Sequence, residues 1–282
     1  MASWLDAPRV YAPLFTTERQ RLLEVLDSVD ATGWTRPTPC PGWNVLGLAT
    51  HLVGDDVSCI AGQRDGHSGT PAPDGLDEHG FIAWLDELQI EWVHAARRLS
   101  PRLVVDLLGW LGDQVVAVVG DQDPAAVTAT VSWASSTPVP KWLDQARELS
   151  ERWIHRQQIL QSLDRPVDLR PDLTEPVLDG LRWAYPYRLG ALHRPAGTSV
   201  AIAVTGPEVE LDWTLVSDGA GWEFGQAADE QCAARLAMTT DQAWRLLTNN
   251  FDARTHGAPI TSGDAEIIGV LLRTRAIIGE PE

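Results

Sequence analysis

The stretch that decides the fold is ELSERWIHRQQIL, residues 148–160. No Gly or Pro occurs between Lys141 and the end of this stretch, and most of its residues are good helix formers. Glu151 and His155 are four residues apart, so on a helix both side chains project over the same patch. Such a pair either binds one metal ion or forms an ordinary ion pair, and the spacing alone favours the ion pair. Apolar residues at spacings of three, four and seven predict that this helix is amphipathic: Trp142, Ala146, Leu149, Trp153, Leu160 and Leu163.

Composition excludes several classes of protein. The 282 residues are enough for one large domain or two ordinary ones. A net charge of −17 repels phosphate backbones and anionic membranes, so we expect neither nucleic acid nor a membrane as a partner. No apolar run reaches the roughly 18 residues of a bilayer span, and the N-terminus does not resemble a signal peptide. Three scattered cysteines argue against a disulfide framework, so we expect a cytoplasmic protein.

The first part of the chain predicts a helical bundle. Helical periodicity and capping residues predict helices over about 16–29, 44–63, 81–99 and 101–119, before the helix described above. Long helices with short or medium connections favour an up-and-down bundle, in which metal sites are commonly built from facing helices. In the fourth helix apolar residues repeat every four positions, at Leu103, Leu107, Leu111 and Val115.

From Thr198 the apolar period changes to two, which predicts strands. Gly206-Pro207 and Asp218-Gly219 are turn signals between them. Another strand is predicted over about 232–237, with helices over about 239–247 and 264–277, and a connecting helix over about 173–192. We therefore expect a helical bundle in residues 1–168, a connector in 169–195 and a small α+β domain in 196–282.

Two motifs resemble those of a known family. WTRPTPCPGWNV at 34–45, followed by ATHL at 49–52, resembles the N-terminal signature of the mycothiol-dependent maleylpyruvate isomerase family, part of the DinB-like superfamily. ERWIH at 151–155 resembles its second signature, a Glu-x-x-x-His on the last bundle helix. The C-terminal part resembles the sterol-carrier-protein-like domain of the same enzymes. The resemblance implies a DinB-like four-helix bundle followed by a small sterol-carrier-like α+β domain.

The resemblance also implies a function. It implies a divalent metal, usually zinc, held by His51, Glu151 and His155, with mycothiol as thiol cosubstrate. Two histidines and one carboxylate leave zinc an open position, as in catalytic sites. We expect an enzyme that acts on a small electrophilic substrate, either an isomerase or an S-transferase, and that is a monomer or small homo-oligomer. The alternative is a non-catalytic accessory or stress protein that binds a metal or another ligand.

Other polar residues have an ordinary interpretation beside a functional one. Asp55, one turn after His51, either orients that histidine or is a solvated or capping residue, and the second is the more frequent case. Glu148 is a weaker candidate ligand than Glu151, because only Glu151 lies four residues from His155. We expect the remaining candidates to be structural cysteines, exposed histidines and solvated arginines unless they meet an anionic substrate: Cys40, Cys59, His67, His79, His94, Arg152, Arg156, Arg188 and Arg194.

Overall fold

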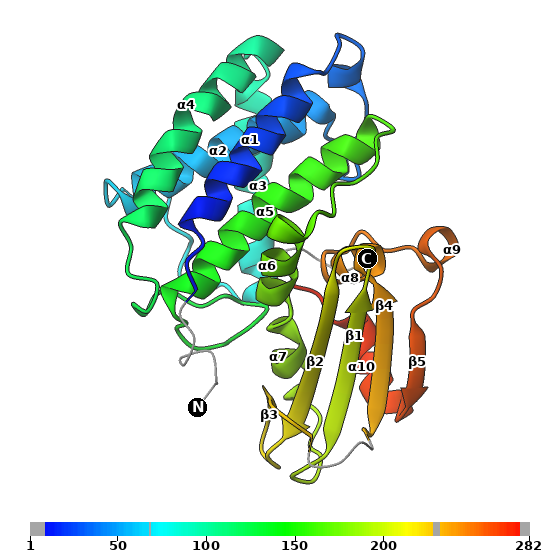
Figure 1. The fold of residues 1–282 in the computed structure, drawn as a ribbon. Coiled ribbons are helices and arrows are strands. Elements are labelled where there is room, and N and C mark those ends of the chain that lie inside the picture. The colour runs from blue at the N-terminus through cyan, green and yellow to red at the C-terminus, as the bar shows by residue number, and fades with distance from the viewer. Residues whose placement is uncertain (1–8, 68, 228–231, 277–282) are drawn as a thin grey trace. The chain divides into compact units, whose positions relative to one another are not determined.

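A computed structural model describes residues 9–67, 69–227 and 232–276. The chain divides into two compact units (Figure 1). One is formed by residues 9–124 and 148–168, and the other by residues 125–147 together with the chain from Leu169 onward. The domain limits expected at residues 168 and 195 stay predictions.

The first unit is a bundle of long helices. In this bundle α4 packs against α1 and α2, and α3 packs against α2. From Glu148 onward, α5 and the residues after it belong to the same unit. The helices are α1 (Ala12–Asp27), α2 (Val45–Gln63), α3 (Glu78–Ala96), α4 (Pro101–Gly120) and α5 (Lys141–Ser162).

Capping residues explain where these helices begin. The Asn44 side chain accepts a hydrogen bond from the Gly47 amide, so α2 begins where predicted. The predicted starts of α1 and α3 are wrong by a few residues. Helix α1 begins at Ala12, because Pro13 is tolerated in the first turn, where its missing N–H has no partner to lose. Helix α3 begins behind Asp77, whose side chain accepts from the Gly80 amide, inside a segment that its composition marks as a loop.

The core face of α4 does not coincide with the four-residue apolar repeat seen in the sequence. Leu103 is 43% exposed, whereas Val104 and Leu108 are fully buried beside Leu111 and Val115. A four-residue repeat advances about 40° around the helix at each step, so its members cannot all face one side.

Helices α2 and α4 are long and apolar enough to cross a bilayer by length and composition, with mean hydropathies of 1.2 and 1.6. In the bundle they pack against each other. A core helix of a globular protein has the same length and composition.

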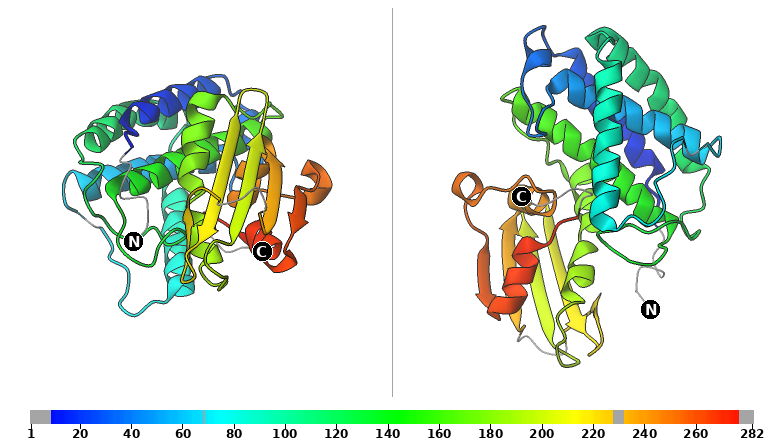
Figure 2. Two further views of the ribbon diagram at one scale, coloured as in Figure 1. Left: turned by 60° about the horizontal axis from the view of Figure 1, so that its bottom comes forward. Right: turned by 180° about the vertical axis from the view of Figure 1, so that it is seen from behind.

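The second unit contains a five-stranded sheet in the order β3-β2-β1-β4-β5 (Figure 2). Strands β1 and β4 are parallel, and the other neighbours are antiparallel. Helices α7, α8 and α10 contact the strands. The strands are β1 (Ser199–Thr205), β2 (Glu210–Ser217), β3 (Trp222–Phe224), β4 (Ala234–Thr239) and β5 (Ile260–Gly263).

The helices of this unit follow the prediction in part. Thr239 and Gln242 form a capping box at the start of α8 (Thr240–Leu247), as the sequence indicates. The predicted connecting helix is two helices, α6 (Pro171–Leu181) and α7 (Ala184–Leu189). The break between α6 and α7 lies four residues before Pro186. In one continuous helix, the Pro186 ring would clash with the backbone carbonyl at that position. Two short elements, α9 (Ala253–His256) and β5, were not predicted, and α10 spans Ala265–Arg273.

The fold class expected from the sequence, a helical bundle followed by a small α+β unit, is confirmed.

Candidate metal centre

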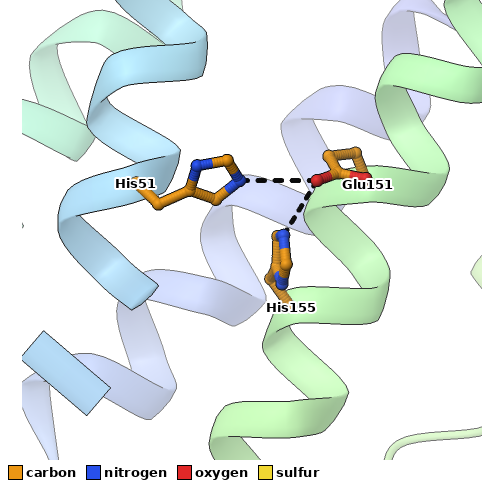
Figure 3. A group of neighbouring side chains, drawn as sticks. All are labelled: His51, Glu151 and His155. Carbon is orange, nitrogen blue, oxygen red and sulfur yellow. Dashed lines mark hydrogen bonds and ion pairs between the residues drawn. The ribbon is translucent and has the colours of Figure 1, made fainter. Parts of the chain in front are cut away.

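Three residues from two helices converge in the bundle (Figure 3). His51 comes from α2, and Glu151 and His155 come from α5. His155 Nε2 lies 2.8 Å from Glu151 Oε1, and His51 Nε2 lies 3.4 Å from the same oxygen. One ligand atom from each residue lies within 4.8 Å of the other two. The fold therefore brings together the three residues that the two sequence motifs single out.

The proline-rich loop before α2 forms one wall of this cluster. The Thr38 amide and hydroxyl both donate to the Trp43 carbonyl, at 3.0 and 2.9 Å, so the loop closes on itself. Gly42 adopts a φ of 81° within it, a conformation that favours glycine. The closed loop places the Trp43 ring 4.9 Å from the His51 ring, centroid to centroid. It also places Cys40 Sγ 4.0 Å from His155 Nδ1, a proximity that the sequence did not indicate.

The second nitrogen of each histidine faces a glutamine. His51 Nδ1 lies 3.0 Å from Gln89 Oε1, and His155 Nδ1 lies 2.7 Å from Gln158 Oε1. Neither glutamine is among the residues that the two sequence motifs single out. Gln158 carries a positional signal, because it lies three residues after His155 on one helix face, whereas Gln89 belongs to α3 and carries none.

The acid and the base perturb each other's pKa. Desolvation by the neighbouring side chains acts to raise the pKa of Glu151, but the charge of His155 and hydrogen bonds from both histidines hold it well below its ordinary value. Burial acts to lower the pKa of His155, but the Glu151 charge and hydrogen bonds with Cys40 and Glu151 raise it well above its ordinary value. The Glu151 carboxylate is thus matched to a positive charge, supplied either by a proton on His155 or by a metal cation.

Comparison with known proteins identifies the family. The model of the mycothiol maleylpyruvate isomerase N-terminal domain matches residues 15–160, just over half of the chain. The chain belongs to this family. The match contains His51, Glu151 and His155, and it confirms the resemblance seen in the sequence motifs.

Solved structures share the fold of this maleylpyruvate isomerase family member. They are crystal structures of the mycothiol-dependent maleylpyruvate isomerase and of a variant with one histidine replaced by alanine. The sequences are 13% and 12% identical to this chain, with TM-scores of 0.55 and 0.54. Each alignment covers 89% of this chain and 91% of the solved one. Comparison with curated proteins gives no match.

The donor set of this family member fits a divalent metal. Two imidazole nitrogens and one carboxylate oxygen are the ligand types of catalytic zinc sites. Both Nε2 atoms face the same Glu151 oxygen, so a cation among them would take the place of the hydrogens that otherwise lie between these nitrogens and that oxygen. The Glu151 side chain is 40% exposed while both histidines are buried, so the cluster is reached from the glutamate side.

Asp55 is part of the surroundings of His51. Its Oδ2 lies 3.2 Å from His51 Nε2, and only 15% of the side chain is exposed. Burial raises the pKa of Asp55 above its ordinary value, although the His51 charge opposes this. The more frequent interpretation, a solvated or capping residue, is therefore wrong. Exposure could not be read from spacing, because it depends on what covers this part of α2.

The expectation that Arg152 and Arg156 are solvated is also wrong, because both are buried in ion pairs. Arg152 donates to Asp56 Oδ1 at 3.0 Å and to Glu148 Oε2 at 2.8 Å. Arg156 donates through two nitrogens to the Glu18 carboxylate, at 2.7 and 2.8 Å. These ion pairs link helices of the bundle. Glu148 is the ion-pair partner of Arg152.

The remaining candidates have ordinary surroundings. Cys59 is buried, His67, His94 and Arg188 are exposed, Arg194 pairs with Asp264 and Glu266, and the side chain of His79 lies outside the described part of the structure.

Proposed function

We propose that this chain is a metal-dependent enzyme that uses mycothiol to act on a small electrophilic substrate, in the manner of a maleylpyruvate isomerase. The observation that carries the proposal is the convergence of His51, Glu151 and His155 within 4.8 Å, inside the domain that defines the family. The two Nε2 atoms and the Glu151 carboxylate would hold the ion, and zinc is the metal that this donor set favours.

A divalent ion bound there would lower the pKa of a coordinating thiol, so that the nucleophilic thiolate forms near neutral pH. The residues of the chain have three tasks around it. His51, Glu151 and His155 supply a compact donor set from two rigid helices. Trp43 lies against the His51 ring and covers that side of it. The exposed part of Glu151 marks the side from which a thiol and a substrate would approach.

Isomerisation and S-transfer share thiol addition and differ in the fate of the adduct, because an isomerase releases the thiol again and a transferase keeps the conjugate. Family membership supports isomerisation of an activated double bond. We therefore propose an isomerase, with conjugate formation as the outcome that would identify a transferase.

The experiment combines metal analysis with a turnover assay. We expect one zinc per chain in the purified protein and turnover of maleylpyruvate only when both mycothiol and metal are present. His155→Ala should remove the metal and the activity, while circular dichroism shows an intact fold. His94→Ala is the matched control, because His94 is an exposed histidine on a neighbouring helix.

Two results would contradict the proposal. One is full turnover without thiol or without metal, and the other is stoichiometric metal in the His155→Ala variant. Mass spectrometry of the products distinguishes the isomer from an accumulated mycothiol conjugate.

A further inference from the structure

Each histidine of the cluster is held at its second nitrogen by a glutamine oxygen. We propose that Gln89 and Gln158 are positioning residues, which fix both imidazoles in the Nδ1–H tautomer and thereby keep both Nε2 lone pairs available to a metal. This inference rests on the proposed metal site and assigns the residues that prepare it.

The orientation of Gln89 follows from Asp55. Gln89 Nε2 donates to Asp55 Oδ1 at 3.5 Å, which turns the amide so that Oε1 faces His51. An amide oxygen only accepts hydrogen bonds. His51 Nδ1, 3.0 Å from that oxygen, must therefore carry the hydrogen.

The orientation of Gln158 follows from two donors. Its Oε1 accepts from Cys40 Sγ at 3.2 Å and lies 2.7 Å from His155 Nδ1. An amide oxygen has two lone pairs and can serve both. His155 Nδ1 is then the donor, and because Gln158 lies one turn further along α5, the contact forms within a single helix.

The consequence concerns the opposite nitrogen of each ring. A neutral imidazole with hydrogen on Nδ1 keeps a lone pair on Nε2, and Nε2 is the atom that faces Glu151 in both histidines. In the other tautomer an N–H would point into the centre of the cluster and would have to be lost before a metal binds. Two unrelated segments, α3 and α5, provide the same arrangement on the two rings. A hydrogen bond at the second ring nitrogen orients metal-binding histidines and raises their basicity.

The test measures zinc affinity by competition with a chromophoric chelator at one pH. Gln89→Leu and Gln158→Leu should each weaken zinc binding about 10–100-fold, the usual effect of losing such a partner. Gln→Glu at either position should bind zinc at least as tightly as the unmodified protein, because a carboxylate is the stronger acceptor. Gln63→Leu is the matched control, because Gln63 is exposed at the far end of α2, and it should leave the affinity unchanged.

A second readout separates positioning from general damage to the fold. Nitrogen-15 NMR of the labelled histidines shows which ring nitrogen carries the hydrogen. In metal-free protein at a pH where the rings are neutral, we expect hydrogen on Nδ1 of both rings of the unmodified protein and a mixture of tautomers on the ring that faces each leucine. At lower pH His155 also carries a hydrogen on Nε2, because Glu151 raises its pKa. Unchanged zinc affinity, unchanged tautomers, or a Gln→Glu variant that binds zinc tenfold more weakly would each overturn the inference.

The two proposals fail in different ways. An unmodified protein that binds no zinc contradicts the metal site, and the tautomers are then still decided by NMR. An unmodified protein that binds zinc, with leucine variants that bind it equally well, contradicts only the role of the glutamines.

Discussion

Asp56→Asn tests how the bundle holds the two helices of the cluster in place. Asp56 is on α2 and is fully buried. One carboxylate oxygen accepts from Arg152 of α5 through two nitrogens, at 3.2 and 3.0 Å, and the other accepts from Arg19 of α1. A single buried carboxylate therefore joins three helices, among them the two that carry His51 and Glu151.

The size of the effect follows from the charges that the substitution leaves behind. Asparagine has nearly the same shape and keeps one acceptor, so the main loss is the negative charge between two buried guanidinium groups. Arg152 keeps Glu148 at 2.8 Å, and Arg19 keeps the Leu108 carbonyl at 3.1 Å. Removing one member of a buried pair destabilises a protein by about 3–5 kcal/mol, and the remaining partners favour the lower end. About 3 kcal/mol corresponds to a fall in the unfolding midpoint of about 6–12 °C.

The assay is thermal unfolding followed by circular dichroism, with urea unfolding as a check. Asp106→Asn is the matched control, because Asp106 forms an exposed pair with Arg102 at 3.9 Å. Such surface pairs contribute about 0–1 kcal/mol. We also expect zinc to bind Asp56→Asn more weakly, because the Asp56–Arg152 pair links α2 to α5. A midpoint shift no larger than that of the control would refute the reasoning.

Three further outcomes are expected. In chelator-treated protein, Glu151, whose pKa is depressed, stabilises the fold above its ordinary pKa of 4.5, and this stability is lost as the pH falls through the folded value. His155, whose pKa is raised, stabilises the fold below its ordinary pKa of 6.5, and this stability is lost as the pH rises through the folded value. The unfolding midpoint should therefore be highest at pH values between the folded-state pKa of Glu151 and that of His155. A Glu151→Gln variant whose midpoint depends on pH in the same way would exclude the Glu151–His155 pair as the cause. Removing zinc with a chelator should lower the unfolding midpoint. If free zinc was 100 times its dissociation constant before chelation, the loss of stability is about 2.7 kcal/mol. An unchanged midpoint would argue against a bound metal. Gly263→Ala should destabilise the sheet by about 1–3 kcal/mol in urea unfolding, because φ at Gly263 is 100° and the added carbon would lie 2.2 Å from the Ala233 carbonyl oxygen. Gly62→Ala is the control and should not destabilise the protein, because there is open space around Gly62.

Much of this protein follows from the sequence by itself, wherever the interaction is local. Helix geometry places Glu151 and His155 on one patch whatever surrounds them, since 3.6 residues per turn bring positions four apart together. The Asn44 cap and the Thr239 capping box depend on atoms within a few residues, so the starts of α2 and α8 were predicted correctly. The change of apolar period near Thr198 likewise reflects the two faces of each strand.

Only the tertiary structure decided which residues surround the cluster. Gln89 reaches His51 from another helix, 38 residues along the chain, and no local pattern marks it. Arg152 looks like a solvated arginine in the sequence and is buried against Asp56 in the fold. Periodicity shows which face of a helix is apolar, but the helix that packs on that face determines whether a neighbouring polar group keeps its water or must find a protein partner. The sequence therefore predicts the ligand types of the candidate site, whereas the hydrogen bonds that orient the ligands arise from the packing of α2, α3 and α5.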